Sequence, residues 1–540
     1  MPTHAAQPSR SVFAGIFAVS AATLLFQVTF VRIFSVSIWY HFAFLVVSIA
    51  LFGIGASGVA LSFVKPGPRE ERYRALAPAC FSVSALLAYL LTNAIPFSPF
   101  RILQDPKQLF FFLVYDVLLM APFFFSGVAV ALILRAFPAR AGRLYAFDLV
   151  GAALGTLLVF FVLPAVGARG AIALASALGL VAAAFLAPVP RMRRGFAIAT
   201  VAHLPLLVMP SLLPDVRMDA TKPVTTEVNE RGGQHVVSRW NALSRIDVVE
   251  KPNANPMIFI DAAAATPVTP PQDSTRAARD ISTIGYRLRP GAAVAVIGSG
   301  GGVDVQNALA LGAQSVTAIE INPIIIDLVT NRYRDTVGGA FSDPRVRLVQ
   351  DEGRSCIARS TENFDVIQIT LIDTWAASVS GAYSLSENYL YTTEAFAEYI
   401  SHLSDDGMLS ITRWYYEMPR LVALARAGLE EVGIEEPSRH VVVVHEKIRA
   451  LLLVKRTPFT TEEMTRVREH TGAFGWTIEH DPVRPVPTAA YENLLSAADP
   501  ASIFKDAEIA LHPVRDDSPF FFQMTRWKSV KLDALRKFGR

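Results

Sequence analysis

Cysteine is scarce in this chain, which has two, Cys80 and Cys356, among its 540 residues. Cys80 lies in an apolar run and Cys356 in a more polar part, so we expect no disulfide between them. Two cysteines are also too few for a cysteine-based metal site. The ten histidines show no H-x-x-x-H or comparable ligand spacing. The sequence therefore predicts no metal site.

Excess charge is scarce as well. The formal net charge is +3, which is too small to indicate nucleic-acid binding, so we expect no nucleic-acid partner.

A cleavable signal peptide is not evident. The first apolar segment begins near Ser11, runs for about twenty residues and lacks a small-residue cleavage site. We interpret this segment as a membrane span that is retained.

Long apolar runs are abundant over residues 11–213. A helical span needs about 20 apolar residues. Seven candidates meet or approach this length: 12–31, 41–64, 76–97, 109–134, 144–167, 170–190 and 196–213. The last is the weakest, because it is short and contains His203, Pro205 and Pro210. We predict an α-helical transmembrane domain of about seven spans over residues 1–213.

Lysine and arginine cluster in the connections that follow the even-numbered spans. The clusters are Lys65, Arg69, Arg72 and Arg74, then Arg135, Arg140 and Arg143, then Arg191, Arg193 and Arg194. The positive-inside rule places these connections and the N-terminus in the cytoplasm. Seven complete spans would leave residues 214–540 outside. An interfacial or re-entrant segment at 196–213 would instead return them to the cytoplasm.

Small and polar residues within the spans indicate helix contacts. Gly151 and Gly155 form a G-x-x-x-G pattern, which predicts close packing against a neighbouring helix. Asp148 is costly at membrane depth and needs a partner. Either it pairs with an arginine such as Arg143, or it lines a substrate cavity.

Residues 214–540 have the charge density of a soluble protein. Alternating runs at 236–240, 245–250 and 257–261 predict a small antiparallel sheet within a linker and β region over 214–290. Residues 273–288 are expected to form a helix that leads into the next domain.

From residue 291 onward, predicted strands and helices alternate. The strands are 294–297, 315–320, 346–350, 364–371 and 407–412, and the helices are 303–311, 323–333, 353–360, 392–404 and 417–432. Runs at 439–444 and 449–454 predict a closing hairpin. A parallel series that ends in an antiparallel hairpin is typical of the Rossmann-like α/β fold of S-adenosylmethionine methyltransferases. We predict this domain over 291–456, followed by a C-terminal extension over 457–540.

A glycine loop follows the first strand of that domain. Gly298, Gly300 and Gly302 are spaced G-x-G-x-G, because Val303 stands where the third glycine of G-x-G-x-x-G would be. Asp304 opens the next helix, where its carboxylate would repel a pyrophosphate on the same amides. A cationic sulfonium ligand without phosphate tolerates this carboxylate. The loop therefore favours S-adenosylmethionine or a relative over NAD.

Acidic residues stand at the ends of the following strands, where ligands of open α/β sheets bind. Glu320 ends the second strand and is expected to accept hydrogen bonds from ribose hydroxyls. Asp351 and Glu352 end the third and can meet an adenine amino group. Asp373 follows the fourth, where it could hold or deprotonate an amine nucleophile.

Together these features resemble the spermidine synthase family of polyamine aminopropyltransferases, in particular its membrane-fused bacterial members. The resemblance covers about 235–455. Its motifs are the glycine loop, Ala318-Ile319-Glu320-Ile321-Asn322-Pro323, Asp343-Pro344-Arg345-Val346, Glu352-Gly353-Arg354, Phe364-Asp365-Val366-Ile367 and Leu390-Tyr391-Thr392-Thr393-Glu394-Ala395-Phe396. The Asp516-Asp517-Ser518-Pro519-Phe520 segment is similar to the membrane-fused branch.

The resemblance assigns the cofactor half of the site more fully than the acceptor half. The family's two strand-end aspartates fall on Thr370 and Asp373, so one is missing. Its glycine-loop aspartate falls on Gly301, and Asp304 could substitute by a shift. The family's Tyr-His-Glu run is not found, and Tyr286 is the nearest tyrosine. Either the acceptor differs, or Glu387, Tyr383 and Tyr389 replace the missing groups.

The resemblance implies a membrane-anchored transferase of polyamine biosynthesis in the bacterial inner membrane. Its co-substrate would be decarboxylated S-adenosylmethionine or S-adenosylmethionine, and its acceptor a polyamine or an amine-bearing lipid. The family often forms dimers, so a homodimer is expected. Because adenosyl cofactors are normally cytoplasmic, the cytoplasmic placement of the soluble part is favoured. The alternatives are a methyltransferase acting on a small or lipid substrate, or a non-catalytic transporter or sensor that binds a nucleoside or polyamine.

Overall fold

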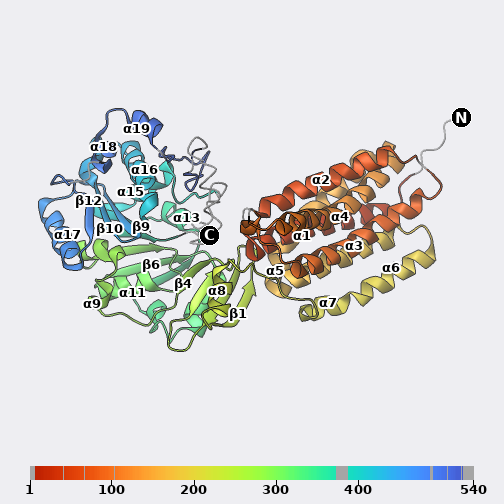
Figure 1. Cartoon of the computed structure of the whole chain (residues 1–540), viewed down its shortest axis with the longest axis horizontal. Helices are drawn as coiled ribbons and strands as arrows, with labels where there is room; N and C mark the ends of the chain where they lie inside the picture. Colours follow the sequence, from red (N-terminus) through yellow and green to blue (C-terminus); the bar gives the residue numbers. More distant parts are fainter. Residues whose placement is uncertain are drawn as a thin grey trace. The chain divides into compact units, whose positions relative to one another are not determined.

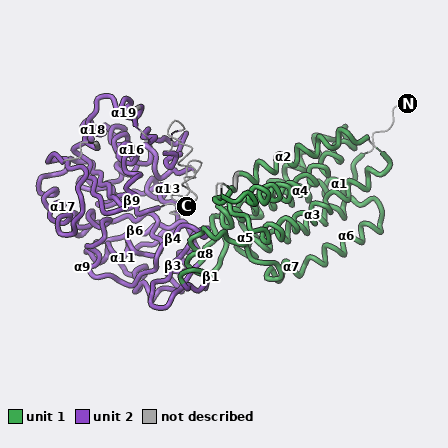
Figure 2. Tube along the Cα trace, in the orientation of Figure 1, with its two compact units in different colours: residues 1–231, 237–247, 536–540 green, residues 232–236, 248–535 purple. Residues whose placement is uncertain are grey.

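The computed structural model describes residues 7–39, 42–65, 67–102, 104–372, 387–486, 490–507, 509–524 and 526. The chain divides into two compact units (Figure 2). The helical unit comprises residues 1–231, 237–247 and 536–540, and the α/β unit comprises residues 232–236 and 248–535.

Five helices of the described chain are long and apolar enough to cross a membrane, where the sequence predicted about seven spans. They are α1 (Arg10–Ser37), α2 (Ala43–Ser62), α3 (Glu70–Ala94), α4 (Lys107–Ala136) and α5 (Ala141–Leu186). The two helices that follow, α6 (Pro190–Ala202) and α7 (Leu204–Val208), are too short to qualify singly.

Helix α5 contains the fifth and sixth predicted spans as two arms. Its backbone leaves the helical region at Gly167, where φ is +66° and ψ is −175°. Both arms pack on the first half of α1. A Cβ atom on Gly151 would lie 2.3 Å from the Phe17 carbonyl oxygen, and one on Gly15 would lie 2.6 Å from the Leu186 side chain. The chain therefore reverses at Gly167, and α5 is a hairpin of two helical arms.

The G-x-x-x-G pattern packs as predicted. A Cβ atom on Gly155 would lie 2.2 Å from the Ala21 carbonyl oxygen, so α1 and α5 approach as closely as their backbones allow. The expected pairing of Asp148 with an arginine is wrong, since its carboxylate accepts a hydrogen bond from the Ser20 hydroxyl of α1. The guanidinium of Arg143 lies instead over the ring of Phe13.

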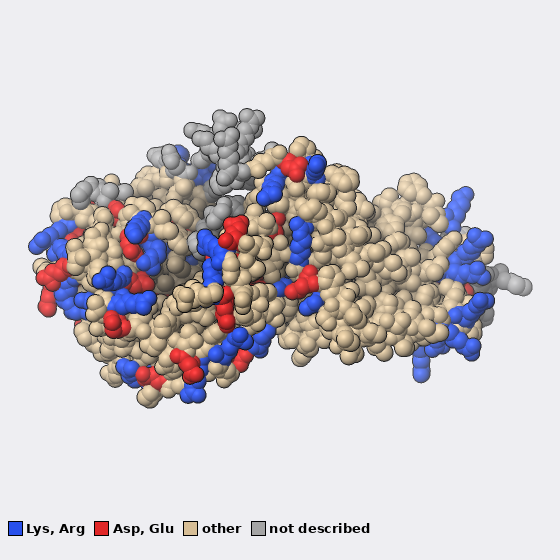
Figure 3. All heavy atoms as spheres, turned by 60° about the horizontal axis from the view of Figure 1, so that its bottom comes forward, with Lys and Arg blue, Asp and Glu red and all other residues tan. Residues whose placement is uncertain are grey.

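One end of the helical unit carries the basic connections. An apolar cluster there joins Ile16, Ala75, Ile133, Leu144 and Leu186, with Met192 and Phe196 packed against it. Arg135 binds Glu70 at 3.2 Å in the same region. Figure 3 shows lysine and arginine side chains gathered at this end, which we call the arginine end.

The opposite end of the helical unit holds residues 213–222. The amide of Asp219 donates to the Ser37 carbonyl at 2.7 Å, and the hydroxyl of Tyr89 donates to the Pro214 carbonyl at 2.6 Å. Arg169 donates to the Leu213 carbonyl at 3.2 Å. Because Met192 and Phe196 lie at the arginine end, residues 190–213 run the length of the unit. This path differs from the interfacial or re-entrant segment that the sequence favoured.

Prolines explain why this last passage is not one helix. Pro205 stands at the start of α7, and Pro210 opens the 3-10 turn Pro210–Leu212. Proline lacks the amide that a continuing helix needs and clashes with the preceding turn. The passage is apolar and outward-facing, with Ile198 70% and Val208 80% exposed, as expected of a surface that lipid would cover.

A four-stranded sheet, in the order β1-β2-β3-β4, precedes the main fold. Its strands are β1 (Gln234–Trp240), β2 (Arg245–Glu250), β3 (Met257–Ile260) and β4 (Ala264–Pro267). Strand β4, which the sequence did not predict, pairs antiparallel with β3. Asp261 and Ala262 turn the chain with φ values of +50° and +60°, the left-handed conformation that tight hairpins require.

The main sheet has eight strands in the order β12-β10-β11-β9-β8-β5-β6-β7 (Figure 1). They are β5 (Ala293–Ile297), β6 (Ser315–Glu320), β7 (Val346–Gln350), β8 (Phe364–Thr370), β9 (Leu403–Trp414), β10 (Val441–Glu446), β11 (Arg449–Lys455) and β12 (Thr477–His480). Strands β5 to β9 pair in parallel. The antiparallel hairpin β10–β11 joins through β11 to β9. This confirms the predicted Rossmann-like domain.

The helices of the α/β unit follow the predicted alternation with one correction. They include α11 (Val303–Ala310), α12 (Pro323–Asp327), α13 (Gly353–Ala358), α15 (Thr393–Ser401), α16 (Met418–Glu431) and α17 (Thr461–Phe474). The single helix expected at 273–288 is wrong. Asp273 caps α9 (Ser274–Ala277) and Asp280 caps η5 (Ile281–Thr283), which leads into α10 (Ile284–Leu288). Each aspartate caps the start of a new helical turn, so three short helical segments form instead of one helix.

Candidate active site

The glycine loop turns tightly between β5 and α11. Gly298, Gly300 and Gly302 have φ values of +69°, +49° and +93°, a region that favours glycine. The amides of Gly298 and Ser299 donate to the Ile319 carbonyl at 2.9 and 3.0 Å. The amide of Gly302 donates to the Ser299 carbonyl at 2.9 Å. These amides are therefore engaged by the protein and do not form a phosphate cradle.

Glu320 fixes the centre of the loop. One of its carboxylate oxygens accepts the amide of Gly300 at 3.0 Å, and the other accepts the amide of Asn322 at 2.9 Å. Burial raises the pKa of Glu320, and these amides oppose the shift. Each carboxylate oxygen can accept more than one hydrogen bond. The side chain can thus hold the loop and still accept a further hydrogen bond, and its contact with a ribose hydroxyl stays a prediction.

Strand β4 closes one side of the loop. The Thr266 hydroxyl accepts the amide of Gly301 at 3.0 Å. A Cβ atom on Gly301 would lie 2.1 Å from the Pro267 carbonyl oxygen. The aspartate that the resemblance places at position 301 therefore has no room in this chain. Thr266 could not be identified from sequence patterns, because it lies 35 residues before its partner.

Glu352 and Asp351, at the end of β7, both bind groups of the nearby helix α13 and the residue that follows it. Both oxygens of Glu352 cap α13, accepting the amides of Arg354 at 3.1 Å and Ser355 at 2.8 Å. Asp351 forms an ion pair with Arg359, which lowers the pKa of Asp351. Both still stand at the carboxyl end of a parallel strand, so their contact with an adenine ring stays a prediction.

The expected acceptor residues are only partly described. Asp373 and Tyr383 lie outside the described residues. Thr370 ends β8, and its hydroxyl accepts from the Gln368 amide at 2.8 Å. Glu387 is exposed and accepts from the Tyr389 hydroxyl at 3.3 Å. Thr370 is therefore half-buried at the end of β8, whereas Glu387 is exposed.

Asp304 lies elsewhere than predicted for a cofactor ligand. Its side chain is buried and faces Tyr286 of α10, Ser282 of η5 and Thr370 of β8 rather than the loop amides. Burial raises the pKa of Asp304 to about 7, while the Thr370 hydroxyl opposes the rise. Asp304 and Thr370 were separate candidates in the sequence, and the fold brings them together.

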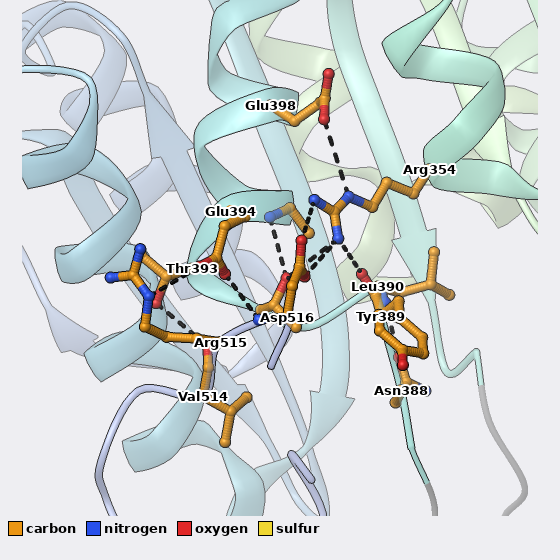
Figure 4. Close-up of polar contacts among 12 residues, drawn as sticks. Arg354, Asn388, Tyr389, Leu390, Thr393, Glu394, Glu398, Val514, Arg515 and Asp516 are labelled. Atoms are coloured by element: carbon orange, nitrogen blue, oxygen red, sulfur yellow. Dashed lines mark hydrogen bonds and ion pairs between the residues drawn. The ribbon is translucent and has the colours of Figure 1, made fainter. Parts of the chain in front are cut away.

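A C-terminal segment, residues 514–524, binds the start of α15 (Figure 4). Asp516 accepts two hydrogen bonds from Arg354, at 2.7 and 2.9 Å, and one from the Thr392 hydroxyl at 2.7 Å. The Arg354 guanidinium lowers the pKa of the Asp516 carboxyl. Arg515 binds Glu394 at 2.8 Å. The acidic motif near the end of the sequence is therefore a structural clamp.

The same segment continues along α16. The amide of Asn388 donates to the Pro519 carbonyl at 2.8 Å, and Arg420 donates to the Phe521 and Gln523 carbonyls at 2.7 Å. Burial lowers the pKa of Arg420 to about 10. These bonds position residues 388–392, which stand at the carboxyl-end edge of the sheet. The sequence indicated the segment but not its partners.

Metal ligands are not clustered in the described ranges, where no three His, Cys, Asp or Glu side chains are placed to hold a metal ion. The chemistry available at this edge is that of a glycine loop, a strand-end glutamate and buried carboxyl and hydroxyl groups. Together they define a class, the Rossmann-like α/β domains, here with a glycine loop whose amides form no phosphate cradle.

Comparison with known proteins shows a similarity that is confined to the α/β unit. Residues 277–418 match the sequence model of the spermine/spermidine synthase domain. The chain is 29% identical over 119 residues to a polyamine aminopropyltransferase of Korarchaeum cryptofilum, covering 22% of this chain and 34% of that protein. It is 26% identical over 155 residues to one of Thermoplasma volcanium, covering 28% and 53%. Residues 277–418 of the chain are thus similar to the spermine/spermidine synthase domain.

These likenesses are partial. The chain spans about a third to a half of the length of these curated relatives. A spermidine synthase structure from Thermotoga maritima is 16% identical, with a TM-score of 0.34, over 50% of this chain and 87% of that one. The helical unit lies outside the matched residues 277–418.

Proposed function

We propose that the α/β unit transfers an aminopropyl group from decarboxylated S-adenosylmethionine to an amine acceptor. The observation that carries this proposal is the glycine loop, whose amides bond to the protein itself around Glu320. Such a loop suits a nucleoside that carries a sulfonium instead of a phosphate. The matched relatives are named polyamine aminopropyltransferases, which supports the same reaction.

The reaction requires alignment more than activation. The acceptor nitrogen attacks the aminopropyl carbon, the carbon–sulfur bond breaks with its electron pair going to sulfur, and the amine loses a proton. In this proposal Glu320 holds the ribose, Glu352 and Asp351 border the adenine, and Asp373 orients the amine and accepts its proton. Holding the two reactants in line can supply much of the rate.

A product assay on the purified, detergent-solubilised chain tests the proposal. S-adenosylmethionine and its decarboxylated form are offered separately, with putrescine or a total lipid extract as acceptor. Methylthioadenosine formed only from the decarboxylated donor is expected, and the acceptor that gains mass is the substrate. S-adenosylhomocysteine would make the chain a methyltransferase instead. Donor binding without either product would refute transfer.

We also propose that the helical unit crosses the membrane and that the α/β unit faces away from the cytoplasm. The arginine end is cytoplasmic under the positive-inside rule. Residues 190–213 lead from that end to the opposite one, where residues 213–222 are bonded to Ser37 and Tyr89. This proposal replaces the cytoplasmic placement favoured from the sequence. It requires the donor to reach the far side of the membrane.

Cysteine labelling in intact cells tests this orientation. In a background of Cys80→Ala and Cys356→Ala, one variant carries Arg69→Cys at the arginine end and another carries Thr361→Cys in the α/β unit. Both positions are exposed. A membrane-impermeant maleimide should label the Thr361→Cys variant alone, and both variants after lysis. Labelling of the Arg69→Cys variant alone would restore the cytoplasmic placement.

A further inference from the structure

A pocket of about 720 Å³ opens between the helices α2, α3 and α4 of the helical unit. These are three of the five helices that are long and apolar enough to cross a membrane. Neither the reaction proposed above nor the matched residues 277–418 involve this part of the chain. We call the pocket the α3–α4 groove; its wall is mainly apolar and includes Leu61, Leu76, Phe124, Phe125, Val128 and Leu132.

The α3–α4 groove runs lengthwise along two of its helices. It extends from Glu70 to Cys80 on α3 and from Phe124 to Arg135 on α4. At 1.5 Å per residue, each stretch is about 15 Å long. The hydrocarbon core of a bilayer is about 30 Å thick, so about 15 Å belongs to each leaflet. The groove therefore has the length of the acyl region of one leaflet.

The wall of the groove is open rather than packed. Val64 is 50% exposed, Tyr73 is 49% exposed and Leu76 is 41% exposed. Deeper in the unit, α2 and α4 touch, because a Cβ atom on Gly127 would lie 2.3 Å from the Ser57 hydroxyl oxygen. An apolar chain can thus cover the exposed side chains without displacing the contact between the helices.

The groove ends in a basic group at the arginine end (Figure 3). Lys65, Arg69 and Arg135 line it there, and Glu70 is the one acid among its described lining residues. Arg135 and Glu70 bind each other at 3.2 Å. Lys65 and Arg69 form no ion pair with a described residue. Two cations therefore remain for an anion.

An occupant of the groove must combine an apolar chain with an anionic head. The apolar wall offers inorganic phosphate no hydrogen-bond donors over most of its length. The basic end repels the ammonium group of an amine-bearing lipid. Basic pockets between transmembrane helices on the cytoplasmic side suit anionic head groups, and long lysine and arginine side chains extend to the level of those groups.

We infer that the α3–α4 groove binds one anionic phospholipid of the cytoplasmic leaflet. An acyl chain lies along α3 and α4 beside Leu76 and Phe125, and the phosphate oxygens accept hydrogen bonds from Lys65 and Arg69. The inference rests on the proposed membrane crossing and orientation of the helical unit. It is independent of the transfer reaction, because an anionic head group is not an amine acceptor.

Native mass spectrometry of the full-length, detergent-solubilised chain tests the charge requirement. The probe is phosphatidylglycerol, and the reference is phosphatidylcholine with the same acyl chains. We expect phosphatidylglycerol to bind about tenfold more tightly or better. Lys65→Gln combined with Arg69→Gln should abolish this preference. The matched control is Arg193→Gln combined with Arg194→Gln, which removes the same charge from exposed positions of the arginine end outside the groove.

A second variant obstructs the groove and leaves its charges in place. Leu76→Trp adds a bulky ring to the apolar wall and should lower phosphatidylglycerol affinity about tenfold. Leu87→Trp is the matched control, because Leu87 lies on α3 outside the groove and is 46% exposed. Thermal unfolding without added lipid checks that each variant is folded.

Equal affinity of the wild type for the two lipids overturns the inference, because the groove would then select hydrocarbon alone. A preference that the Arg193 and Arg194 control lowers equally also overturns it, in favour of diffuse attraction to the whole arginine end. Displacement of the lipid by an equal concentration of glycerol phosphate would assign the basic end to free phosphate instead. Any of these results, with the cysteine-labelling pattern as expected, refutes the lipid site and leaves the proposed orientation and transfer reaction intact.

Discussion

Replacing Asp304 by asparagine should stabilise the protein above neutral pH. The pKa of this carboxyl group is raised by burial to about 7 from an ordinary value of 3.8. Hydroxyls of Thr370 and Ser282 face it, and Asp280 and Arg449 act on it from farther away. A raised carboxyl pKa leaves stability intact below the unfolded value and removes it as pH rises through the folded value.

The size of the effect follows from the two pKa values. A difference of about 3 units corresponds to roughly 4 kcal/mol, lost progressively between about pH 4 and pH 7. Asparagine does not ionise, so the Asp304→Asn protein should not show this loss. At pH 8 we expect its Tm to exceed that of the wild type by several degrees. At or below about pH 4 the two should nearly coincide.

Thermal unfolding of both proteins in detergent, at pH 4 and pH 8, measures this difference. Asp335→Asn is the control, because it removes a carboxyl group from an exposed position. Equal pH dependence in the wild type and the Asp304→Asn variant would show that Asp304 is not held neutral by its surroundings.

Three further substitutions test other contacts. Glu320→Gln leaves a loop amide facing an amide donor and should lower affinity for methylthioadenosine by 10- to 100-fold, from about 1.5–3 kcal/mol, in calorimetry. Arg354→Lys removes the bidentate bond to Asp516 and should speed tryptic cleavage within the C-terminal segment. Gly155→Val should lower Tm by several degrees through its clash with α1, whereas Gly142→Val, with open space around it, should not.

The sequence predicted those features that depend on neighbouring residues. Apolar runs marked the central strands within a few residues, and the turn at Gly298 with an acid at Glu320 located the cofactor end of the sheet. Thr460 and Glu463, three residues apart, form the capping box of α17. In each case a hydrogen bond or a burial pattern close along the chain decides the structure.

Features that depend on distant contacts were not predicted. Thr266 closes the glycine loop only because β4 returns over it, and the turn at Asp261 and Ala262 lacks the usual asparagine or glycine. Asp304 was predicted to face the cofactor from the start of the helix. Its position on α11 instead directs its side chain toward Thr370 of β8. The path of residues 190–213 likewise depends on contacts with α5 that hydropathy does not reveal.

The bonded state of the glycine loop also affects how a nucleoside would associate. Its backbone amides are held by Ile319, Glu320 and Thr266 before any ligand arrives. A loop that is already ordered loses little conformational entropy when it is occupied. The nucleoside should therefore bind to a preorganised loop, and the entropy lost on association should come mainly from the ligand.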